Sequence, residues 1–174
     1  DVRGTAFMTA DPADCVFESE LLPSYDEVRA EKTAYADATR VEYAQHDPIR
    51  GKALIQKQDK KYLVVNPPAM PLSSAELDEV AELPYTRWYH PMYEGMGGVD
   101  AIEEVRFSVI HNRGCFGGCS FCALAFHQGR MVTARSQKSV VREVTALTKL
   151  PDFKGYIADV GGPSANFSHP SCQK

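Results

Sequence analysis

The sequence predicts an α/β protein in which a mixed α+β region precedes the first strand–helix–strand unit of a parallel sheet. Two β-prone segments, residues 105–110 and 155–160, flank an amphipathic helix over residues 137–150. Parallel sheets are built from this order of elements, because the crossover helix returns the chain to the end where the first strand began. We therefore expect a mixed α+β region over 1–98 and a truncated parallel-sheet domain over 99–174.

Serine–glutamate capping boxes mark the starts of two helices in the first region. In such a box the serine side chain and the glutamate side chain, three residues apart, each accept a hydrogen bond from a backbone N–H at the helix start. The boxes predict a long helix over residues 25–45 and a short helix over residues 75–83. The two boxes are Ser24 with Glu27 and Ser73 with Glu76.

Short runs of β-prone residues predict strands at 2–8, 53–56 and 62–65. The polar residues between the second and third runs favour a hairpin. Residues 84–98 are rich in proline, glycine and aromatic side chains, which predicts an ordered loop at the boundary between the two regions.

Composition and charge narrow the class of protein. Hydrophobic residues make up 44% of the 174 residues and charged residues 24%, which is typical of a globular chain. The net charge of −4 and the absence of a basic cluster give no reason to expect a nucleic-acid surface. No apolar run approaches the roughly 20 residues of a membrane helix, and no signal peptide opens the chain. We expect a cytoplasmic protein and, because both ends look cut, a piece of a longer one.

Three of the five cysteines lie close together, in the cysteine loop of residues 114–122. Cys115, Cys119 and Cys122 have the spacing C-x3-C-x2-C, and clustered thiols indicate metal binding in a reducing compartment. Three thiolates can hold a four-iron cluster and leave its last iron without a protein ligand, open to a substrate or cofactor. A structural zinc site with His127 as fourth ligand is the alternative.

A second glycine-rich segment, Gly161-Gly162, follows the strand at 155–160. In parallel α/β sheets, ligand sites collect beyond the carboxyl ends of the strands. We therefore expect this segment and the cysteine loop to face one pocket. Taken alone, the two glycines would be read as a tight turn. The nearby polar residues His127, Arg130 and Arg135 could contact a substrate or cofactor, but positions on the solvated surface are favoured.

Together these motifs resemble the YgiQ-like branch of the radical SAM enzymes, and the resemblance covers nearly the whole chain. Five blocks carry it in order: LPSYDEV at 22–28, NPP at 66–68, LPY at 83–85, RGCFGGCSFC at 113–122 and DVGGPSAN at 159–166.

The resemblance implies a [4Fe-4S] cluster on the three cysteines and S-adenosylmethionine as a second cofactor. In such enzymes the open iron binds the amino and carboxylate groups of S-adenosylmethionine. An electron from the cluster then releases methionine and a 5′-deoxyadenosyl radical, which abstracts hydrogen from a substrate, unknown in this case. Gly161, Gly162 and Pro163 match the cofactor-binding strand end, although Pro163 stands where many members have glutamate.

The resemblance also implies a partial (β/α) barrel of radical SAM type, of which this chain holds one βα unit and the next strand. Because most of the pocket wall would be missing, we expect the fragment alone to be inactive. An electron donor such as flavodoxin or ferredoxin is the implied partner. The alternative is a non-catalytic metal module, either a zinc-stapled fold or an electron-carrying iron–sulfur protein.

Overall fold

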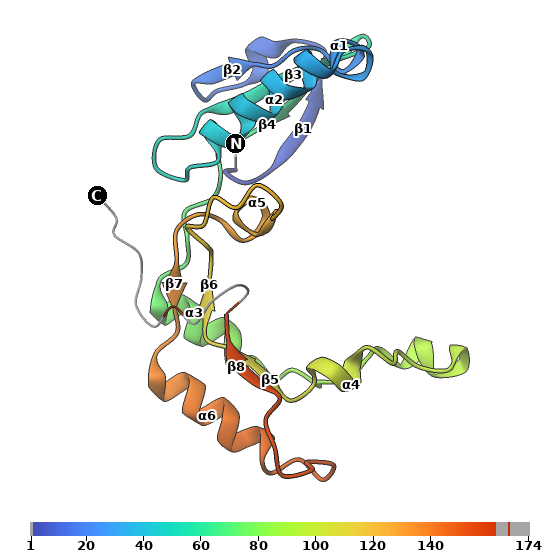
Figure 1. Ribbon diagram of the computed structural model, residues 1–174, viewed down its shortest axis with the longest axis vertical. Coiled ribbons are helices and arrows are strands. Elements are labelled where there is room, and N and C mark those ends of the chain that lie inside the picture. Colours follow the sequence, from blue (N-terminus) through green and yellow to red (C-terminus); the bar gives the residue numbers. More distant parts are fainter. Residues whose placement is uncertain (1, 163–166, 168–174) are drawn as a thin grey trace. The chain divides into compact units, whose positions relative to one another are not determined.

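The computed structural model describes residues 2–162 and residue 167. The chain divides into two compact units, Asp1–Pro71 and Leu72–Lys174 (Figure 1). Among the described residues, no helix is both long enough and apolar enough to span a bilayer.

The first unit is a four-stranded sheet with two helices. Its strands are ordered β1-β4-β3-β2, antiparallel except for the parallel pair β2 and β3. The hairpin of β3 and β4 confirms the predicted pair of strands. Both helices contact β3, and the buried apolar side chains lie mainly on β3 and β4. The elements are β1 (Ala6–Thr9), η1 (Pro12–Asp14), β2 (Ser19–Leu21), α1 (Tyr25–Ala30), α2 (Lys32–Gln45), β3 (Ala53–Gln58) and β4 (Lys61–Val65).

The single long helix predicted over 25–45 is wrong, because the chain breaks it into α1 and α2 at Glu31. The capping box of Ser24 and Glu27 starts α1 as predicted. Glu31 then adopts an extended conformation, with φ −127° and ψ 126°, and a new helix begins at Lys32. Both helices contact β3, one on each side of the break at Glu31.

The second unit contains the predicted strand–helix–strand order. Strands β5 and β8 form a two-stranded parallel sheet, and α6 packs against β5 around the buried Val109 and Leu147. The parallel pair confirms the expected unit, and a barrel around it stays a prediction. The elements are α3 (Ser74–Ala81), η2 (Pro91–Met96), α4 (Ile102–Val105), β5 (Ser108–Ile110), β6 (Asn112–Arg113), α5 (Leu124–Gln128), β7 (Thr133–Ala134), α6 (Gln137–Leu147) and β8 (Asp159–Gly161).

The second unit begins at Leu72, well before the boundary expected at 98/99. Helix α3 starts at the predicted capping box of Ser73 and Glu76, but its polar side chains contact α6. Three pairs join residues 78–87 to the region of α6: Asp78 with Ser136, Glu82 with Arg142, and Arg87 with Glu143.

Candidate functional site

The ends of β5 and β8 lie side by side at one edge of the parallel sheet. Ile110 is paired with Gly161, and the His111 N–H donates a hydrogen bond of 2.9 Å to the Gly161 carbonyl oxygen. Since the strands are parallel, the cysteine loop and Gly162 both follow from this edge. The predicted placement of the two strand ends is therefore confirmed.

The short strand β6 lies between β5 and the cysteine loop. Strand β6 pairs antiparallel with β7, and the Cys115 N–H donates to the Gly129 carbonyl oxygen at 2.9 Å. Gly114 has φ +90°, and a Cβ there would lie 2.1 Å from the Met131 carbonyl oxygen. The base of the loop is thus closed by backbone contacts that only glycine fits at this position.

Two of the three predicted ligand sulfurs face the same space. A Cβ built on Gly117 would lie 3.3 Å from Cys115 Sγ and 3.7 Å from Cys119 Sγ. The Gly117 N–H also donates to Cys115 Sγ at 3.4 Å, and the Cys122 N–H donates to the Cys119 carbonyl oxygen at 3.1 Å. The absent side chain at Gly117 therefore leaves a cradle between two thiols.

The structure does not assemble a complete metal site. Cys115, Cys119 and Cys122 are free thiols, and Cys119 is exposed. Within the part of the chain that the structure describes, no group of three or more His, Cys, Asp or Glu side chains could hold a metal ion. Phe121, which could have covered a cluster, is 90% exposed. The three-cysteine ligand set stays a prediction.

Near the cysteine loop, the ring of Phe116 packs on that of Phe167, with ring centroids 4.6 Å apart. Phe167, which follows β8 in the sequence, therefore contacts the loop.

The glycine end of β8 contacts a side chain that the sequence analysis did not single out. Gly161 is buried, and a Cβ on Gly162 would lie 2.1 Å from Asn112 Oδ1 and 2.4 Å from Asn112 Nδ2. A side chain at 162 would therefore overlap the Asn112 amide unless one of the two moved. Pro163, the third residue expected to bind the cofactor, lies outside the described residues.

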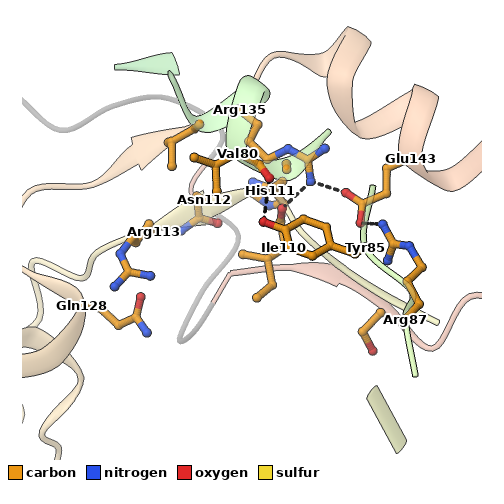
Figure 2. Close-up of a pocket in the computed structure, with 13 residues that line it drawn as sticks. Val80, Tyr85, Arg87, Ile110, His111, Asn112, Arg113, Gln128, Arg135 and Glu143 are labelled. Carbon is orange, nitrogen blue, oxygen red and sulfur yellow. Dashed lines mark hydrogen bonds and ion pairs between the residues drawn. The ribbon is translucent and has the colours of Figure 1, made fainter. Parts of the chain in front are cut away.

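A cavity of about 300 Å³ lies between α3, β5, β6 and α6 (Figure 2). Asn112, Arg113 and Gln128 line one part of its wall, and Arg135 and Glu143 line another. Asn112 is only 2% exposed, and neither polar atom of its amide has a hydrogen-bond partner among the described residues.

The expectation that Arg135 is a surface residue is wrong. Its side chain is 6% exposed and forms an ion pair with Glu143, whose side chain is 11% exposed and also pairs with Arg87 (Figure 2). Arg135 also donates to the Ile110 carbonyl oxygen at 2.9 Å and to Ser139 Oγ at 2.8 Å. Arg135 therefore connects β5 to α6 through its contacts with Ile110, Ser139 and Glu143.

Comparison with known proteins gives matches along the chain. The family described as "Radical SAM N-terminal" matches residues 1–108, a range that ends before the cysteine loop. A UPF0313 protein of Clostridium perfringens (strain ATCC 13124) is 52% identical over 174 residues, covering 99% of this chain and 26% of the relative. A UPF0313 protein of Clostridium botulinum (strain ATCC 19397) is 52% identical over 173 residues, covering 99% of this chain and 27% of the relative.

No solved structure matches the chain. The chain spans about a quarter of the length of the curated relatives it matches, and those matches run through the cysteine loop. The chain therefore belongs to the radical SAM N-terminal family and to its YgiQ-like members, as the sequence motifs predicted.

Proposed function

We propose that this chain is part of a radical SAM enzyme whose cofactors meet at the edge of the β5–β8 sheet. The observation that carries the proposal is the hydrogen bond from His111 N–H to the Gly161 carbonyl oxygen. This bond holds the strand leading to the cysteine loop beside the strand that ends in two glycines. Both segments expected to bind cofactors are thereby kept at one edge.

The cysteine loop has features that suit a [4Fe-4S] cluster. Cys115 and Cys119 face the cradle at Gly117, and the N–H of Gly117 donates to the sulfur of Cys115. Backbone N–H groups directed at sulfur stabilise a thiolate and tune the potential of an iron–sulfur cluster. Cys115, Cys119 and Cys122 would hold three irons, and the bound cluster would supply the electron for reductive cleavage of S-adenosylmethionine.

The glycine end of β8 would bind the amino-acid end of S-adenosylmethionine. The Gly161 carbonyl oxygen accepts one hydrogen bond from His111 and has a second lone pair free to accept another. Since Gly161, Gly162 and Pro163 offer no charged side chain, this segment can contribute only backbone groups to the contacts. The chain's role here is to bind and orient the cofactor. A flavodoxin or ferredoxin would deliver the electron, and the substrate is not identified.

A non-catalytic metal module is the second candidate, because His127 lies on α5, in the segment closed by the hydrogen bond between Cys115 and Gly129. A Cys3His set would therefore come from one continuous segment, as structural zinc sites often do.

The test is the formation of 5′-deoxyadenosine by anaerobically reconstituted full-length protein with S-adenosylmethionine and a strong reductant. We expect product from the full-length protein and little from residues 1–174 alone. Gly161→Val should lower the yield while the iron content stays unchanged. Iron-loaded full-length protein that forms no product would contradict the enzyme and favour the metal module.

A further inference from the structure

Asn112 is a buried polar residue that the packing of the described residues does not explain. Its side chain is 2% exposed, and both Oδ1 and Nδ2 lack a hydrogen-bond partner within the described part of the chain. A buried amide without partners costs free energy, and nearly all buried polar groups in native proteins are paired. The burial of the Asn112 amide is therefore not explained by a contribution to stability.

Asn66 shows what a structural asparagine looks like in the same chain. It is 5% exposed, and its Nδ2 donates to the Val2 carbonyl oxygen at 3.0 Å and to Thr5 Oγ1 at 3.2 Å. Asn66 joins the segment before β1 to the end of β4, so its burial is compensated by hydrogen bonds. Asn112 has the same chemistry and similar burial but none of this compensation.

The amide of Asn112 lies where the two candidate cofactor segments meet. Asn112 follows β5 and precedes Cys115, and its amide packs against the backbone of Gly162. It also lines the cavity, together with Arg113 and Gln128 (Figure 2). A donor and an acceptor are thus offered together beside the glycine end of β8.

We propose that Asn112 is a cofactor-binding residue whose amide hydrogen-bonds the amino-acid end of S-adenosylmethionine. Its oxygen can accept from an N–H of the amino group and its nitrogen can donate to the carboxylate, so one side chain complements both polar groups at the amino-acid end. The inference rests on the proposed function, and it explains why an unpaired amide is kept buried against Gly162.

The experiment measures binding of radiolabelled S-adenosylmethionine to iron-loaded full-length protein without reductant, so that affinity is read without turnover. Asn112→Leu should weaken binding at least tenfold, and Asn112→Ser, which keeps one polar group, should weaken it less. Asn112→Leu should also leave Tm unchanged or raise it in the absence of cofactor, because it removes an unpaired amide without leaving a cavity. The matched control Asn66→Leu should lower Tm and leave the affinity unchanged.

Two results would overturn the assignment of Asn112 while leaving the proposed function standing. The first is wild-type affinity in Asn112→Leu. The second is a loss of iron in both Asn112 variants, which would mean that the amide serves the fold of the cysteine loop. A third result, an iron-loaded wild-type protein that binds no S-adenosylmethionine, would contradict the proposed function and the role of Asn112 with it.

Discussion

Asp78 on helix α3 accepts two hydrogen bonds from Ser136, the residue that caps helix α6. The Ser136 N–H donates at 2.9 Å and the Ser136 hydroxyl at 2.5 Å. The hydroxyl oxygen in turn accepts from the Ser139 N–H at 3.1 Å, as an N-cap does. The carboxylate of Asp78 thus lies at the N-terminus of α6, the positive end of the helix dipole. It joins α3 to α6 through two residues that are 58 positions apart in the sequence.

The hydrogen bonds between Asp78 and Ser136 make the stability of the fold depend on pH. Burial alone would raise the pKa of Asp78, but the hydrogen bonds from Ser136 and the charge of Arg135 outweigh it and lower the pKa below 3.8. A lowered pKa in the folded state means that the unfolded chain binds the proton more readily, so the stabilisation is present above about pH 4 and is lost as pH falls below it.

Asp78→Asn should therefore lower stability at pH 7 by about 1–2 kcal/mol and reduce the loss of stability below about pH 4. Urea unfolding across pH 3–7 measures both effects. The control is Glu79→Gln, at the exposed neighbouring residue, which should change neither. An acid response in Asp78→Asn as steep as in wild type would contradict the role given to Asp78.

Glu143→Gln should destabilise the protein by about 3 kcal/mol, because it leaves the nearly buried guanidinium of Arg135 without its counter-charge. The matched control is Arg142→Gln on the same helix, whose partner is Glu82. That pair is more exposed, with side-chain exposures of 55% and 39%, and its loss should cost less than about 1 kcal/mol. Equal costs in urea unfolding would show that Glu143 behaves as a surface residue.

Gly114→Ala should disrupt the base of the cysteine loop, since the new Cβ would meet the Met131 carbonyl oxygen at 2.1 Å. Gly155→Ala is the control, because Gly155 has a similar φ of +93° but no heavy atom within 4 Å of a Cβ. We expect the control to cost about 1 kcal/mol, from backbone strain alone. Gly114→Ala should cost more and lower the iron content of the reconstituted full-length protein. Wild-type iron in Gly114→Ala would show that the loop holds its metal without this contact.

Gly162→Ala should destabilise wild-type protein, because its Cβ would overlap the amide of Asn112. In an Asn112→Ala background the space is open, so the same change should cost less, with a coupling of about 1–2 kcal/mol. A double-mutant cycle by urea unfolding measures this coupling. Additive costs would mean that Gly162 is needed for a reason other than Asn112.

The elements that could be predicted from the sequence are those fixed by short-range chemistry. The capping boxes at Ser24 and Ser73 start helices where expected, because each box is complete within four residues. Ser136 caps α6 for the same reason. The parallel pairing of β5 with β8 follows from the crossover rule, which needs only the order of the elements.

The features that could not be predicted depend on contacts between distant residues. Arg135 is buried because Glu143 and the Ile110 carbonyl oxygen receive its guanidinium, and neither partner is visible in a local pattern. The break at Glu31 lies between two helices that each contact β3, and these contacts are not visible in a local helical pattern. The burial of the unpaired Asn112 amide also could not be read from the sequence, since Gly162, which packs against it, is distant in the chain.

The most direct test of the account is the iron and acid-labile sulfide content of anaerobically reconstituted full-length protein and its cysteine variants. We predict about four irons per chain in wild type, matched by sulfide and a brown colour. Alanine at Cys115, Cys119 or Cys122 should lower both contents, whereas Cys15→Ala, at a thiol that donates to the Phe17 carbonyl oxygen, should not. Full iron and sulfide in the triple variant, or a colourless wild-type protein that holds zinc in place of iron, would contradict the account.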